Sequence, residues 1–133
     1  MPKTVTFVTN QYQCDRIICA AREVADVNNS DLVVVGILDA EYEVDPEVVD
    51  YLFRLSKQNK AAMRLVFSAD KLHAMRDTLS EADCRWVVTG MPGNNQSVLY
   101  DLWREYKDQT FYTVDTTGEL MKSTPVLAAR KID

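Results

Sequence analysis

Histidine is almost absent from this chain, whose 133 residues include only His73. That scarcity excludes chemistry that needs a histidine pair, such as the H-x-G-H motif of nucleotidylyl transferases. The three cysteines, Cys14, Cys19 and Cys84, form no C-x-x-C pair and lie in or beside apolar patterns. This arrangement favours reduced thiols over a zinc site or a disulfide framework. For Cys14, near a helix start, burial is favoured over a reactive thiol.

Glycine is also scarce, with four residues, and the common glycine-based site motifs are missing. There is no G-x-x-x-x-G-K-(S/T), no G-x-G-x-x-G and no G-x-S-x-G, which excludes P-loop, dinucleotide-fingerprint and nucleophile-elbow chemistry. A phosphoacceptor receiver domain is disfavoured as well. Asn10-Gln11 and Phe67-Ser68 stand where that class needs acidic side chains.

No apolar run is long enough to cross a bilayer, and the first residues lead directly into a strand pattern without a signal-peptide region. We therefore expect a cytoplasmic protein without a membrane partner. The net charge is -5, and the Lys and Arg residues are scattered rather than grouped in a stripe. This balance argues against nucleic acid as a partner.

What the chain does have is a regular alternation of strand and helix patterns with short connections, which predicts an α/β fold with helices on both faces of a parallel sheet. We expect one domain over residues 1–115, a five-stranded sheet of order 3-2-1-4-5, and a C-terminal tail over 116–133. The predicted strands are Thr4 to Thr9, Asp31 to Leu38, Ala62 to Phe67, Cys84 to Thr89 and Thr110 to Val114.

Four helices are predicted from apolar residues at helical spacing. Asp45-Pro46 is a suitable start for the second helix, and Ser68 is a candidate cap for the third. We interpret the apolar stripes as core. They are Ile17, Ala21, Val24 and Ala25; Val48, Val49, Leu52 and Phe53; Leu72, Met75 and Leu79; and Val98, Leu99, Leu102, Trp103 and Tyr106.

The turn from Thr89 to Ser97 is the first candidate binding site, because it joins a strand pattern to a strongly amphipathic helix pattern. Such a turn directs backbone N–H groups and the helix dipole at a small volume, which suits a phosphate or another anion. In the expected strand order the turn faces Thr9-Asn10 across a crevice. An ordinary strand-to-helix turn would have the same composition.

Three short motifs resemble the universal stress protein-like domain of potassium-sensor histidine kinases and its small relatives. They are Val8-Thr9-Asn10-Gln11-Tyr12-Gln13-Cys14-Asp15-Arg16-Ile17-Ile18, Tyr51-Leu52-Phe53-Arg54-Leu55-Ser56-Lys57 and Val87-Val88-Thr89-Gly90. The resemblance covers roughly Thr4 to Asp115 and implies a Rossmann-like universal stress protein fold.

Members of that family that bind ATP carry a G-x2-G-x9-G-(S/T) loop, whose first half matches Gly90 and Gly93. The third glycine of the pattern would fall at Trp103, and a shorter loop places Gln96-Ser97-Val98 there instead. The resemblance also places Asn10 where ATP-binding members usually have Asp, and Ile37 against adenine. The residues so implied in binding are Thr9, Asn10, Ile37, Gly90, Gly93, Asn94 and Ser97.

The resemblance implies a stress-response regulatory or ligand-sensing module with a reduced nucleotide site, holding ATP, AMP or no cofactor. The loop from 90 to 97 has no Lys or Arg, so a triphosphate would depend on backbone amides, Ser97, a metal ion or Arg16. The alternative is a homodimeric interaction module without nucleotide binding, which would use an edge strand at 111–114 and the tail. The apolar edge strand favours a homodimer in either case. We assign no catalytic or metal-ligating residue.

Overall fold

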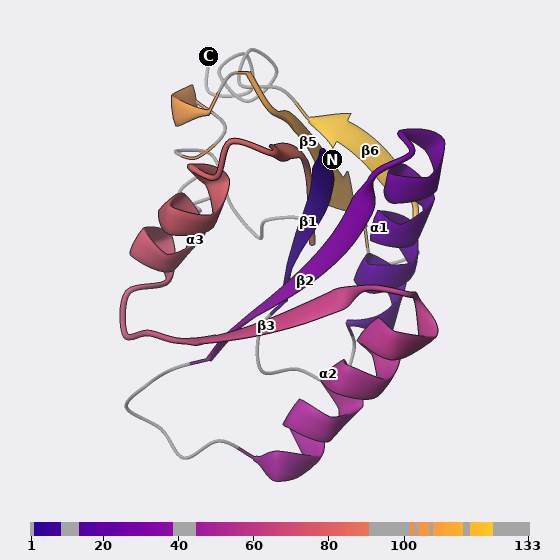
Figure 1. Cartoon of the computed structure of the whole chain (residues 1–133), viewed down its shortest axis with the longest axis vertical. Helices are drawn as coiled ribbons and strands as arrows, with labels where there is room; N and C mark the ends of the chain where they lie inside the picture. Colours follow the sequence, from indigo (N-terminus) through magenta and orange to yellow (C-terminus); the bar gives the residue numbers. More distant parts are fainter. Residues whose placement is uncertain are drawn as a thin grey trace.

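One twisted sheet with helices packed on its two faces organises the chain (Figure 1). This computed structural model describes residues 2–8, 14–38, 45–90, 102, 104–106, 108–115 and 118–123. The strands are β1 Lys3–Val8, β2 Asp31–Leu38, β3 Ala62–Phe67, β4 Cys84–Gly90, β5 Thr110–Val114 and β6 Leu120–Ser123. The helices are α1 Asp15–Val27, α2 Pro46–Gln58 and α3 Lys71–Leu79.

The sheet has the order β3-β2-β1-β4-β5-β6. Strands β1 to β5 are mutually parallel, which confirms the predicted order 3-2-1-4-5. Strand β1 is buried from end to end and β2 is buried after Asp31, as the continuous apolar run of β2 predicted, because helices cover both faces. Strand β3 lies at one edge and is partly exposed along its length.

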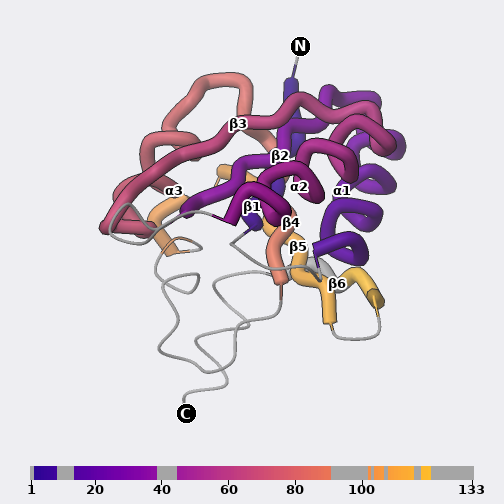
Figure 2. Tube along the Cα trace, turned by 90° about the horizontal axis from the view of Figure 1, so that it is seen from below, coloured from indigo at the N-terminus to yellow at the C-terminus, as the bar shows by residue number. Residues whose placement is uncertain are grey.

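Helices α1 and α2 lie on one face of the sheet and α3 lies on the other (Figures 1 and 2). The core is correspondingly divided. Val5 and Phe7 of β1 pack with Met75 and Leu79 of α3, whereas Val8 packs with residues of α1 and α2. Alternate side chains of β1 therefore serve two separate hydrophobic layers.

Most of the predicted helix stripes are buried, but one assignment was wrong. Val48 and Leu52 are buried, whereas Phe53 is 47 % exposed. Phe53 lies one position, about 100° of helix rotation, beyond Leu52, which takes it off the face that contacts the sheet. The buried face of α2 continues instead to Ser56.

The helix starts follow capping chemistry, with one correction. Asp45 caps α2 as predicted, because its Oδ1 accepts from the Glu47 amide at 2.9 Å. Helix α3 is capped by Asp70, which accepts from the His73 amide at 3.1 Å, and not by Ser68. The Ser68 hydroxyl is used within the preceding turn, where it contacts the Asp70 backbone.

The predicted fourth helix falls only partly within the described residues. Leu102 is helical and fully buried beneath the α3 side of the sheet, and Arg104 and Glu105 continue that helical backbone. Tyr106 is partly buried against the same cluster. Val98, Leu99 and Trp103 lie outside the described residues.

A sixth strand follows β5 in the segment expected to be a tail. Strand β6 pairs antiparallel with β5 after a tight turn in which Asp115 accepts hydrogen bonds from the Gly118 and Glu119 amides. Gly118 has φ +89°, a backbone conformation that glycine adopts without strain. We propose that the domain extends at least to residue 123. The expectation that residues 111–114 form the sheet edge was wrong, because β6 covers them.

Candidate functional site

The strand order reverses between β1 and β4. From β1 the chain crosses through α1 to β2, whereas from β3 it crosses through α3 to β4 on the other side of β1. Thr6 is paired with Val88, so Val8 and Gly90, each two residues further along, end their strands at the same level. Ligands of open α/β sheets bind outside the carboxyl ends of the strands at such a reversal.

Gly90 brings the end of β4 against the first turn of α1. A Cβ built on Gly90 would lie 3.3 Å from Cδ1 of Ile17, tighter than ordinary van der Waals contact. A side chain at Gly90 would therefore require Ile17 to shift by a few tenths of an ångström. The close approach places the N-terminus of α1, with the positive end of its helix dipole, beside the carboxyl ends of β1 and β4.

Arg16 lies in the same first turn and connects it to the β5–β6 turn. Its Nε donates to the carbonyl oxygen of Asp115 at 3.0 Å. Because Asp115 directly follows β5, this contact spans the α1 side of the carboxyl edge. Arg16, which the sequence offered as a phosphate ligand, therefore donates a hydrogen bond within the protein at this edge.

Of the seven predicted binding residues, the structure describes two. Gly90 is partly exposed at the end of β4. Ile37 is 1 % exposed and packs in the α3-side cluster, so a base would reach it only if its neighbours shift. The other predicted residues lie outside the described residues: Thr9, Asn10, Gly93, Asn94 and Ser97.

Thr89, the residue before Gly90, begins the candidate turn but was not among the seven predicted binding residues. Thr89 is 3 % exposed, and its Oγ1 has no hydrogen-bond partner in the described part of the chain. The available signal was a hydroxyl residue near the end of an otherwise apolar strand that leads into the candidate loop.

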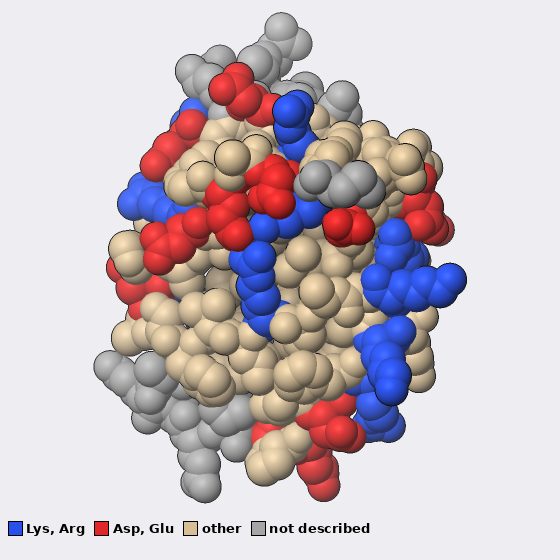
Figure 3. Space-filling model, in the orientation of Figure 1, with Lys and Arg blue, Asp and Glu red and all other residues tan. Residues whose placement is uncertain are grey.

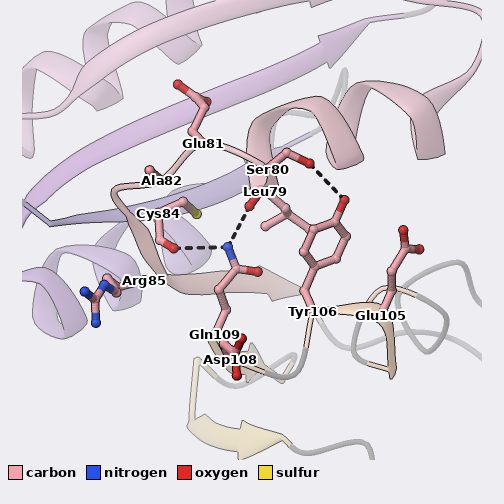
Figure 4. Close-up of a pocket in the computed structure, with 10 residues that line it drawn as sticks. All are labelled: Leu79, Ser80, Glu81, Ala82, Cys84, Arg85, Glu105, Tyr106, Asp108 and Gln109. Atoms are coloured by element: carbon pink, nitrogen blue, oxygen red, sulfur yellow. Dashed lines mark hydrogen bonds between the residues drawn. The ribbon is translucent and has the colours of Figure 1, made fainter.

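The amino edge of the sheet holds a separate pocket of about 610 Å³ between the end of α3 and the start of β5 (Figure 4). Gln109 closes one side, with Nε2 donating to the carbonyls of Leu79 at 2.7 Å and Cys84 at 3.0 Å. The Tyr106 hydroxyl lies 3.1 Å from that of Ser80. These contacts join α3, β4 and the segment before β5.

The pocket has a thiol but no activated nucleophile among its described lining. Cys84 is buried, and desolvation raises the pKa of its thiol to about 11. The neutral thiol therefore predominates at neutral pH, and a thiolate is the form that reacts. We assign this pocket a structural role in joining its elements.

A second hollow of about 380 Å³ at the amino edge is bordered by an ion-pair network. Lys3 Nζ lies 2.9 Å from Glu81 and 3.2 Å from Asp83, and Arg64 contacts Glu81 at 2.8 Å. Acidic and basic side chains adjoin one another across the middle of the face in Figure 3. These cations are thus balanced by neighbouring carboxylates.

Other chemical groups are dispersed. His73 is exposed on α3 and lies 3.5 Å from Asp77, an ion pair only when the imidazole is protonated. Within the described ranges, no group of three or more His, Cys, Asp or Glu side chains could hold a metal ion. No helix among those residues has the length and apolarity needed to span a membrane.

The sheet order and the crossovers define a doubly wound α/β protein. No protein-family model and no curated protein matches the sequence. Among solved structures, a crystal structure of a universal stress protein in complex with cAMP matches with a TM-score of 0.66. The two share 17 % sequence identity, over 86 % of this chain and 97 % of that chain. The chain therefore has the fold of a universal stress protein.

Proposed function

We propose that this chain is a universal stress protein-like sensor that binds an adenine nucleotide at the carboxyl edge of its sheet and acts without hydrolysing it. The observation that carries the proposal is the reversal between β1 and β4, where Val8 and Gly90 end level. The α1 N-terminus lies against that point through the Gly90–Ile17 contact. The site would be completed by Thr9 and Asn10 on one side and Gly93, Asn94 and Ser97 on the other.

The fold neighbour supports a cyclic or mono-phosphorylated nucleotide as the first ligand to test, since that universal stress protein is in complex with cAMP. A single phosphate also matches the local chemistry. The loop over residues 90–97 carries no Lys or Arg, so backbone amides and Ser97 would hold the phosphate. A monophosphate needs less charge compensation than ATP. A regulatory role in a cytoplasmic stress response is part of this proposal.

The proposal is tested by calorimetric titration with cAMP, AMP and ATP, with and without Mg²⁺. We expect saturable binding to the wild type and its loss in Gly93→Val, which places a side chain in the predicted phosphate loop. Arg85→Ala, at the amino-edge pocket, is the matched control and should bind as the wild type does. Absence of binding to the wild type, or loss in Arg85→Ala alone, would refute the carboxyl-edge site.

A homodimer, the alternative expected from the sequence, cannot form on the edge first assigned to it. Strand β6 occupies the outer side of β5, so the outer strands of the sheet are β3 and β6. Any dimer built by sheet extension would have to use one of these two. Sedimentation velocity over a range of protein concentrations measures whether such a dimer forms.

A further inference from the structure

Two threonine hydroxyls on the central strands β1 and β4 have no hydrogen-bond partner within the described residues. They are Thr6 Oγ1 and Thr89 Oγ1. Thr6 is fully buried and Thr89 is 3 % exposed. Their neighbour Thr4, also fully buried, is satisfied by the Ser30 hydroxyl at 2.7 Å. Burying a hydroxyl without a partner is unfavourable, so each unpaired group needs an explanation.

The two hydroxyls differ in their place in the fold. Thr6 lies within β1 and is followed on the same face by Val8, which packs with α1 and α2. Thr89 is the last residue of β4 with a side chain, because Gly90 has none. It therefore lies directly at the carboxyl edge, where the strand order reverses.

The surroundings of Thr89 are mainly apolar, although its partner on β5 is the buried Thr113. Alternation along β4 places it on the same face as Val87, which belongs to the α3-side cluster with Phe7 and Ile37. The register that pairs Thr6 with Val88 places Phe7 beside Thr89. A hydroxyl in such a wall matches a heterocyclic base, which has apolar faces and a hydrogen-bonding edge.

We infer that the Thr89 hydroxyl hydrogen-bonds the edge of the nucleobase and makes the site selective for ligands that carry a base. The inference rests on the proposed function and adds a specificity-determining residue to it. Less than 1 Å² of Oγ1 is accessible in the unliganded chain. Contact therefore requires the carboxyl edge to open as the base enters, which also gives the base access to Ile37.

The test is Thr89→Val, which keeps the side-chain shape and removes the hydroxyl, with Thr6→Val as the matched control. Both variants should be at least as stable as the wild type, because each loses an unpaired buried hydroxyl. Only Thr89→Val should bind AMP and adenosine more weakly, by about tenfold, the value of one hydrogen bond. Ribose 5-phosphate, which has no base, should bind both variants and the wild type equally.

The outcomes separate this inference from the proposed function. If the wild type binds AMP and Thr89→Val binds it equally well, Thr89 is not a ligand contact, but the nucleotide site stands. An equal loss for ribose 5-phosphate would refute contact with the base. If the wild type binds none of these compounds, both proposals fail. Thr89→Ser, which keeps a hydroxyl, should retain AMP affinity, and its failure to do so would also count against the inference.

Discussion

The residues after the ends of α1 and α2 have a left-handed backbone conformation although neither is glycine. Helices α1 and α2 end alike, each with an asparagine, Asn28 or Asn59, whose side-chain amide donates to a carbonyl four residues earlier. The next residue in each case has positive φ, Asn29 at +50° and Lys60 at +54°. Asparagine tolerates this left-handed region, whereas lysine is strained in it.

Lys60→Gly is therefore expected to stabilise the protein. The gain should be about 0.5–1 kcal/mol, because relief of the left-handed strain exceeds the added chain entropy of glycine in the unfolded state. Urea unfolding measures it. Asn29→Gly, at nearly the same φ, should change the free energy of unfolding by less. Destabilisation by Lys60→Gly would show that the lysine side chain contributes more than its backbone costs.

Residue-level prediction from sequence succeeded where the chemistry is local. The Asp45-Pro46 start of α2 was predicted, because a capping carboxylate and a proline act on their own turn. Phe53 was misplaced, since the packing of α2 on the sheet decides which helix face is buried, and Phe53 lies off that face. The unpaired hydroxyl of Thr89 could not be predicted for a similar reason. Its lack of a partner is a property of the packed sheet.

At the scale of elements, the Lys3–Glu81–Arg64 network connects β1 and β3 to the turn before β4. The hydrogen bond from Arg64 lowers the pKa of Glu81, burial opposes this, and the bond from Lys3 lowers it further. A carboxylate with a lowered pKa stabilises the fold above its unfolded pKa. That contribution is lost as pH falls through the folded pKa.

Glu81→Gln should lower the free energy of unfolding at pH 7 by about 1 kcal/mol, the scale of a partly exposed charge network. Its loss of stability on acidification below about pH 4.5, the ordinary pKa of glutamate, should be smaller than that of the wild type. Urea unfolding from pH 3 to pH 7 gives both curves. Asp50→Asn, which removes an exposed pair with Arg54, is the control. If the free energy of unfolding fell equally on acidification for the wild type and Glu81→Gln, this account would be contradicted.

Element prediction worked well for the parallel strands. Three of the five predicted strand ranges, including Asp31–Leu38, agree with the structure, since each is rich in apolar and β-branched residues and is bounded by turn residues. Strand β6 was not predicted, because Leu120–Ser123 is a short strand of four residues at the edge of the sheet. Asp115 and Gly118 carried the signal for it, an aspartate three residues before a glycine that can take positive φ in a hairpin turn.

For the whole molecule, the sequence predicted the sheet order and therefore the edge at which a ligand should bind. It could not predict whether that edge forms a complete nucleotide site. The close contact of Gly90 with Ile17 and the buried position of Ile37 depend on packing between distant segments. Family resemblance suggested which loops to consider, and the reversal between β1 and β4 gives that suggestion a structural basis.

The most direct test of the central claim is a titration of ¹⁵N-labelled protein with cAMP, followed by amide chemical shifts. The account predicts the largest shifts at the carboxyl edge, at Val8 and Gly90, with Arg85 and Gln109 at the amino edge unchanged. Saturable shifts centred on Arg85 and Gln109, or no shifts at any cAMP concentration, would contradict it.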